Sequence, residues 1–389
     1  MRKKIVLLRS PALSFTGYGV HSRQIAKWLL SKGDQIDLKF NVLQWGESTW
    51  HIAQDKFGGI VQDIFQRSVD SKFKGADVSI QVQLPDEWDT TVAKFNIGVT
   101  AGVETDTCNP KWIEKINEMD LVIVPSKFVK DTFIKTGGVT TRIEVVHESF
   151  QEFDETKIDP SFIDFSTDFN FLVFGQITGL SSLTDRKNTF SAVKWILETF
   201  KDDPRVGVIV KTNAGKNSIK DRNFCKSIFE SLVSQTRKGS FPKVHLLHGD
   251  LTEEEVYSLY RHPKIKALVS TTRGEGYGLP LLEAASQNLP VIATNWSGHL
   301  EFLNEGKFIS LDYKLQEINE AKVDGRIFLK GQKWADVSEE DYKRKISKFR
   351  SSSTIPKEWA NELGEKIRNK FNIEEIKRQY DITLGDFIL

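Results

Sequence analysis

A glycine-rich loop carrying two glutamates is the strongest chemical pattern in this sequence. Residues 271–294 read TTRGEGYGLPLLEAASQNLPVIAT, which predicts a strand end, a loop, a helix and a strand in that order. The loop contains Gly274, Gly276 and Gly278, and glycine permits backbone angles that other residues avoid. A helix that begins after such a loop presents backbone N–H groups and the positive end of its dipole. The pattern therefore predicts an anion-binding site.

The carboxylates of Glu275 and Glu283 flank this predicted site. Glu275 lies in the loop, and Glu283 lies about one turn into the helix, roughly 5 Å further along its axis. Carboxylates accept hydrogen bonds from sugar hydroxyls while backbone amides bind phosphate, so the pair fits a nucleotide sugar. The alternative is that Glu275 is an exposed loop residue and Glu283 a first-turn glutamate favoured by the helix dipole.

A second predicted anion site is the sequence DRKN at residues 185–188, directly before a predicted helix over residues 188–201. Two cations at a helix N-terminus, Arg186 and Lys187, suit a diphosphate leaving group. Lys211 ends the strand VGVIVK and is a further candidate for a phosphate contact. The alternatives are solvated charges on a turn and a surface lysine.

Four more residues are candidates on weaker patterns. Gly17 and Gly19 form a predicted turn between the first strand and a helix over residues 21–30, Glu104 lies in a loop, and His248 ends a strand. Plain turn glycines, an ordinary loop carboxylate and a structural histidine are the alternatives. The turn is no G-x-G-x-x-G fingerprint, which disfavours dinucleotide oxidoreduction, and the spacing of the seven histidines predicts no metal site.

The elements that position these residues alternate between strand and helix. Short apolar runs form two series separated by the polar stretch 148–170, and amphipathic segments lie between them. This predicts an α/β fold of two doubly wound parallel sheets with a ligand cleft at the carboxyl ends of the strands. The predicted strands are 4–8, 78–82, 95–99, 121–124, 143–146, 171–174, 206–210, 243–247, 267–271 and 291–294.

Length and composition exclude several classes of protein. The chain of 389 residues favours two domains, and 54 Lys and Arg against 53 Asp and Glu exclude an entirely basic surface. Two cysteines exclude a disulfide scaffold and fit a reducing compartment. Without a signal-peptide core or an 18-residue apolar run, we expect a cytoplasmic protein, compatible with peripheral membrane association. Residues 341–380 carry a local net charge of +5, as a solvated helical face or a weak site for an anionic partner.

The segment 271–294 resembles the E-x7-E motif of the retaining glycosyltransferases of family 4, which have the GT-B fold of two facing Rossmann-like domains. The resemblance covers residues 1 to about 310, fades over 311–360, and returns in the terminal helix. The other similar landmarks are the Lys-Asn step at 187–188, the glycine turn 16–19, the region 98–133 with Glu104, Thr105, Trp112 and Ser126, the region 244–260, and Gly298 with Glu301.

The resemblance implies a role for each candidate. The first glutamate of the motif contacts the donor sugar or lies near the reacting centre, and the second binds the ribose hydroxyls; these roles fall on Glu275 and Glu283. The amides of residues 277–279 would hold sugar hydroxyls and diphosphate. The catalytic candidates are Glu275, Lys187, Arg186 and Glu104, and the donor-binding candidates are Glu283, Gly276, Tyr277, Gly278, Leu279, Lys211, Gly17, Gly19 and His248.

The resemblance implies a retaining, hexosyltransferase-type glycosyltransferase that uses a nucleotide sugar without metal or cofactor and attacks from the front face. We expect an acceptor-side domain over 1–160, a donor domain over 161–362, and a helix over 363–389 that crosses back. The acceptor stays open between a glycan, a lipid-linked sugar, a protein, a small molecule and a modified nucleic acid. The alternative functions are a nucleotide-sugar epimerase, a phosphorylase and a non-catalytic nucleotide-sugar-binding protein.

Overall fold

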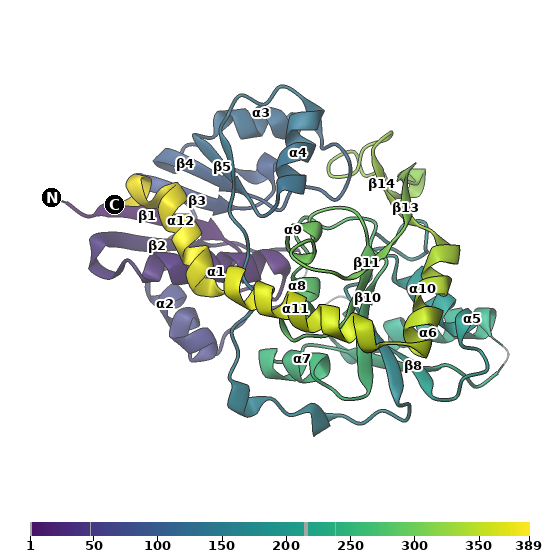
Figure 1. Cartoon of the computed structure of the whole chain (residues 1–389). Coiled ribbons are helices and arrows are strands. Elements are labelled where there is room, and N and C mark those ends of the chain that lie inside the picture. The colour runs from purple at the N-terminus through teal and green to yellow at the C-terminus, as the bar shows by residue number, and fades with distance from the viewer. Residues whose placement is uncertain (1, 47, 214–216, 238) are drawn as a thin grey trace. The chain divides into compact units, whose positions relative to one another are not determined.

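The structure is a computed structural model that describes residues 2–46, 48–213, 217–237 and 239–389. The chain divides into two compact units (Figure 1). Unit 1 comprises Met1–Ser149 and Phe371–Leu389, and unit 2 comprises Phe150–Lys370. Each unit has its own six-stranded sheet and its own apolar core, so each is described separately.

The sheet of unit 1 is entirely parallel, with the strand order β2-β1-β3-β4-β5-β6. Its strands are β1 (Lys4–Ser10), β2 (Ile36–Val42), β3 (Ala76–Val82), β4 (Ala93–Val99), β5 (Leu121–Val124) and β6 (Ile143–Val145). Its helices are α1 (Gly17–Leu30), α2 (Ile60–Gln66), α3 (Pro110–Glu118), α4 (Lys127–Thr136) and α12 (Ile373–Ile388).

Helix α12 belongs to unit 1 although the chain reaches it only after unit 2. It lies beside α1 (Figure 1), where Trp28 stacks on Tyr380 at 5.0 Å and donates from Nε1 to Asp381 at 2.7 Å. Its apolar face, including Ile376 and Leu384, joins the core formed by β1 and its neighbours. Burial of these side chains holds the C-terminal segment on the N-terminal sheet.

Unit 2 has a parallel sheet with the strand order β12-β11-β10-β7-β8-β9 and a separate antiparallel hairpin of β13 and β14. Its strands are β7 (Phe169–Phe174), β8 (Val206–Thr212), β9 (Lys243–His248), β10 (Ile265–Ser270), β11 (Val291–Thr294), β12 (Ile309–Leu311), β13 (Tyr313–Glu317) and β14 (Lys333–Val337). Its helices are α5 (Thr189–Thr199), α6 (Ile219–Thr236), α7 (Glu253–Tyr260), α8 (Leu279–Ser286), α9 (Leu300–Leu303), α10 (Glu339–Ser351) and α11 (Thr354–Lys370).

The strand order of unit 2 reverses between β7 and β10. The chain proceeds from β7 outward through β8 and β9, then returns to β10 and proceeds outward through β11 and β12. In doubly wound sheets ligands bind outside the carboxyl ends of the strands at such a switch point. The loops that follow β7 and β10 contain the predicted residues Arg186, Lys187 and Glu275, so the topology places all three at this edge.

The basic segment 341–380 is not one charged face. Its residues are divided between α10, α11 and α12, and α12 belongs to the other unit. Many of its cations pair with carboxylates: Lys343 with Glu198 and Glu339, Lys345 with Asp341, Arg350 with Asp203, Lys370 with Glu305, and Arg378 with Glu375. This arrangement favours the interpretation of solvated helical faces.

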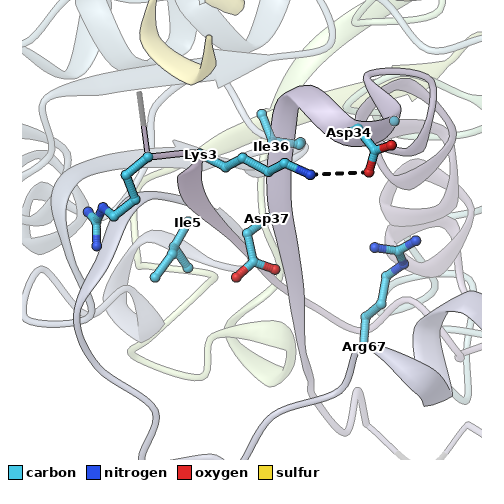
Figure 2. Close-up of a pocket in the computed structure, with 8 residues that line it drawn as sticks. Lys3, Ile5, Asp34, Ile36, Asp37 and Arg67 are labelled. Atoms are coloured by element: carbon cyan, nitrogen blue, oxygen red, sulfur yellow. Dashed lines mark hydrogen bonds and ion pairs between the residues drawn. The ribbon is translucent and has the colours of Figure 1, made fainter.

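A pocket lies at the amino-terminal edge of the sheet of unit 1. It is formed at the amino-terminal ends of β1 and β2, and Figure 2 shows Lys3 bonded to Asp34 across it, with Nζ 3.1 Å from Oδ1. None of its lining residues is a predicted site residue. Ligands of parallel sheets bind at the opposite, carboxyl edge, so we assign this pocket no role.

No helix in the described part of the chain has the length and apolar character needed to cross a membrane.

Candidate active site at the switch point of unit 2

A partly buried ion pair joins the two predicted anion sites. Lys187 Nζ lies 2.6 and 2.7 Å from the two carboxylate oxygens of Glu275, and Arg186 Nη1 lies 3.6 Å from Oε2 of the same group. Arg186 also donates to Gly274 O at 2.8 Å. The structure therefore brings three predicted catalytic residues together. The alternatives of an exposed Glu275 and of solvated charges at 186 and 187 are wrong.

The Glu275 carboxyl is ionised at neutral pH although the residue is buried, with only 7% of its surface exposed. Burial alone would raise its pKa, but the charges of Lys187 and Arg186 outweigh burial and lower the pKa to about 2. The result is a compact charged cluster at the carboxyl edge of the sheet. Such a cluster can exchange internal ion pairs for contacts with an anionic, hydroxyl-rich ligand.

A short hydrogen-bond circuit holds the two cations in place. The Thr178 hydroxyl donates to Asp185 Oδ1 at 2.7 Å and accepts from the backbone N–H of Arg186 at 2.8 Å. The other carboxylate oxygen of Asp185 accepts from Thr189 N, at the start of α5, at 2.8 Å. Residues 177–185 therefore fold into a turn that fixes the backbone before the helix.

The glycines in and beside the loop differ in backbone conformation and in how closely they are packed. Of the three glycines in the loop only Gly278 adopts a left-handed conformation, with φ of +100°, and α8 begins directly after it with proline in its first turn. A Cβ on Gly298 would lie 2.0 Å from Gly276 O, and the Gly298 N–H donates to Glu275 O at 2.9 Å. The backbone freedom expected of the loop glycines is therefore seen as a left-handed conformation at Gly278, directly before the helix.

We expect Gly298→Ala to destabilise unit 2 by more than about 2 kcal/mol, because the new methyl group would overlap a backbone oxygen that has no room to move. Urea unfolding measures this loss. Gly239→Ala is the matched control, since a Cβ there meets nothing within 4 Å. Equal stability of the two variants would show that the loop is not packed as described.

Glu283 lies on α8 and is 9% exposed. It accepts a hydrogen bond from the Tyr260 hydroxyl at 3.3 Å, and burial raises the pKa of its carboxyl to about 8. The helix has no acidic residue in its first turn, so the alternative of a first-turn glutamate stabilised by the dipole is wrong. No cation contributes to the shifted pKa of this buried carboxyl. A ligand with hydroxyl groups can therefore supply the hydrogen bonds that the carboxyl needs.

The remaining donor-binding candidates of unit 2 border the same edge of the sheet. Lys211, at the end of β8, is buried and donates to Gly249 O at 2.6 Å and Asn213 Oδ1 at 2.8 Å, so the alternative of a surface lysine is wrong. Burial lowers the pKa of Lys211 to about 8, and burial also lowers that of His248, the last residue of β9. Tyr277 is buried with its ring against Phe302, and Leu279 begins α8.

Three predicted residues belong to unit 1. Gly17 and Gly19 lie inside α1, whose N-cap Thr16 accepts from the Gly19 N–H at 3.3 Å, so the predicted turn at 16–19 was wrong. Gly19 is packed tightly, because a Cβ there would lie 2.2 Å from Ser14 O. Glu104 follows β4 in the loop before α3 and is half-buried.

Sequence reasoning missed four residues that support the site. Ser297 Oγ accepts from Glu275 N at 2.9 Å, His299 Nε2 lies 2.7 Å from Thr294 O, and Tyr260 contacts Glu283. Arg273, directly before the loop, is discussed below. The signal for Ser297 and His299 was their place just after a predicted strand in the same sheet, where they could have been predicted to face the loop. In the described residues no three His, Cys, Asp or Glu side chains gather as a metal site.

Comparisons with known proteins give two kinds of likeness. A family model described as Glycosyl transferases group 1 matches residues 229–322, the part of unit 2 that contains Glu275 and Glu283. A curated protein from Thermosipho melanesiensis, "Probable sucrose-phosphate synthase", is 33% identical over 102 residues. That alignment covers 25% of this chain, and the chain spans only 22% of the relative's length.

Solved structures match over almost the whole chain. Sucrose-phosphate synthase from Thermosynechococcus elongatus aligns with a TM-score of 0.62 at 12% identity, covering 99% of both chains. HepE from Anabaena, solved in complex with UDP-glucose, aligns with a TM-score of 0.60 at 13% identity, covering 98% of this chain and 100% of the other. These likenesses confirm the predicted fold: two Rossmann-like α/β units, as in GT-B proteins.

Proposed function

We propose that the protein is a retaining glycosyltransferase that transfers a sugar from a nucleotide-sugar donor bound to unit 2. The observation that carries the proposal is the cluster of Lys187, Arg186 and the buried Glu275 at the switch point, with the buried Glu283 on α8, the helix that follows the same loop. The match of residues 229–322 to Glycosyl transferases group 1 supports the reaction class. The UDP-glucose complex of the similar HepE makes UDP-glucose the first donor to test.

In the proposed reaction Lys187 and Arg186 bind the diphosphate, and the amides at the start of α8 bind the sugar and phosphate oxygens. The bond between the sugar C1 and the diphosphate oxygen breaks as C1 bonds to the acceptor oxygen on the same face. The acceptor proton passes to the leaving diphosphate. The cations stabilise the negative charge that develops on that group, and no metal or covalent enzyme intermediate is required.

A thermal-shift panel of UDP-, GDP-, ADP- and TDP-sugars tests donor binding. A ligand at about 100 times its Kd stabilises the folded state by about 2.7 kcal/mol, which raises Tm by several degrees. We expect at least one donor class to produce this shift, and Glu283→Ala to abolish it. Absence of a shift with every donor would contradict the proposal.

Product analysis separates transfer from the other functions of such a fold. Incubation of the donor with pooled saccharides, sugar phosphates and lipid-linked sugars should give a glycosylated product that retains the donor's anomeric configuration. A changed sugar on the nucleotide without any acceptor would indicate an epimerase. Tight donor binding without hydrolysis or transfer would indicate a binding protein.

A further inference from the structure

The buried Arg273 forms hydrogen bonds with three segments around the proposed donor site. Its Nη1 lies 2.8 Å from Asp336 Oδ1, and its Nη2 donates to Ser182 O at 2.9 Å. Its backbone N–H donates to Arg186 O at 2.8 Å, and its backbone oxygen accepts from Ala335 N at 2.9 Å. One residue thus ties the glycine loop, the cation-bearing turn and strand β14 together.

The hairpin 313–337, formed by β13, β14 and the residues between them, makes a second tie to the same turn. Lys322 donates from Nζ to Thr178 O at 2.9 Å, and its ammonium lies 5.0 Å from the centroid of the Phe328 ring. The buried Trp334 lies under the Arg273 guanidinium at 5.3 Å and packs edge-on against Phe328. Figure 1 shows β13 and β14 as a hairpin apart from the main sheet.

These contacts converge on the backbone that carries the charged cluster. Thr178 accepts from Arg186 N, so Lys322 acts on a residue that directly positions the cations. Arg273 bonds to the main chain of Arg186 on one side and is two residues from Glu275 on the other. A guanidinium presents its donors in a rigid planar fork, which fixes the directions of several partners at once, whereas the lysine ammonium is a point charge on a flexible chain.

We propose that the hairpin 313–337 is a brace that sets the separation of Lys187 and Glu275, with Arg273 and Asp336 as positioning residues and Lys322 as a second anchor. The brace acts through the backbone of the turn and of the glycine loop and touches no donor atom itself. This inference rests on the proposed function for its catalytic consequence, whereas its geometric consequence can be measured without any substrate. Small errors in the placement of charged groups cost large factors in rate.

The catalytic arm compares Arg273→Lys, Asp336→Asn and Lys322→Met with Lys330→Met. Lys330 is in the same hairpin but pairs with Glu320, and both side chains are about four-fifths exposed. We expect Arg273→Lys and Asp336→Asn to lower kcat at least tenfold, Lys322→Met to lower it severalfold, and all three to change kcat by a larger factor than the donor KM, since the charge that Lys187 and Arg186 stabilise develops on the diphosphate only in the transition state. The control should change neither. A lower Tm with unchanged kcat well below Tm would overturn the proposal, because a merely structural role predicts that result.

The geometric arm measures the coupling between Lys187 and Glu275 in a double-mutant cycle of urea unfolding, with Lys187→Met and Glu275→Gln. We expect this coupling to fall by at least half in the Lys322→Met and Asp336→Asn backgrounds, which remove less buried surface than a change at Arg273, and to persist with Lys330→Met. Unchanged coupling would overturn the brace. If the wild-type protein transfers no sugar, the proposed function fails while this arm still decides the inference.

Discussion

Lys187→Ala should lower kcat of sugar transfer by roughly 10²–10³-fold, the loss typical when one preorganised donor to a developing anion is removed. Lys187 is the group with the shortest contacts to Glu275, and in the proposed reaction it exchanges this partner for the leaving diphosphate. Arg186 remains in the variant, but its nearest contact to Glu275 is 3.6 Å, so it replaces the lost charge only in part. Single-turnover assays at saturating donor measure the effect.

The same substitution also leaves the carboxylate of Glu275 buried with one cation fewer, which raises its pKa and destabilises the fold. The double variant Lys187→Ala/Glu275→Gln separates the two effects, since it removes the buried charge and should recover stability without recovering turnover. Lys194→Ala, on an exposed position of α5, is the matched control. Normal turnover in Lys187→Ala would show that the cluster has no role at the leaving group.

Much of the fold could be predicted because parallel strands are buried on both faces and read as apolar runs. Strands β5, Leu121–Val124, and β11, Val291–Thr294, were predicted with their observed ends. Strand β2 was missed because it lies at the edge of the sheet, where Asp37 and Lys39 alternate with apolar residues and interrupt the run.

The chemistry of the site could be predicted in kind but not in geometry. The sequence pattern indicated which residues approach an anion, yet it could not show that Lys187 and Glu275 bond directly, because they are 88 positions apart. The hairpin 313–337 gave no recognisable pattern, since β13 is short and all five of its residues are exposed. Its contacts depend on Arg273, a residue whose charge alone suggests an exposed position.

Glu283→Gln should weaken nucleotide binding by roughly 10²-fold and remove a pH dependence that wild type shows. Binding of a ribose diol requires the carboxylate, because only the ionised form accepts both hydroxyl protons. Burial raises the pKa of Glu283 to about 8, so at pH 6 to 7 the free protein must release a proton to bind. Wild-type affinity should therefore rise up to about tenfold per pH unit below 8 and level off above it.

The raised pKa of Glu283 also makes the unfolding free energy of the unliganded protein decrease as the pH rises. Between about 4.5, the ordinary pKa of the carboxyl, and about 8, the folded state holds a proton that the unfolded chain has released. The unfolding free energy therefore decreases as pH rises through this window, by up to about 1.4 kcal/mol per pH unit, and Glu283→Gln removes that slope. Urea unfolding and nucleotide titrations from pH 6 to 9 measure both effects. The ligand's own phosphates titrate equally in both experiments, so the comparison with the variant isolates the contribution of Glu283. Nucleotide affinities that change with pH equally in both proteins would assign the ribose contact to another residue, whereas loss of both slopes together identifies this carboxyl as the group that the donor satisfies.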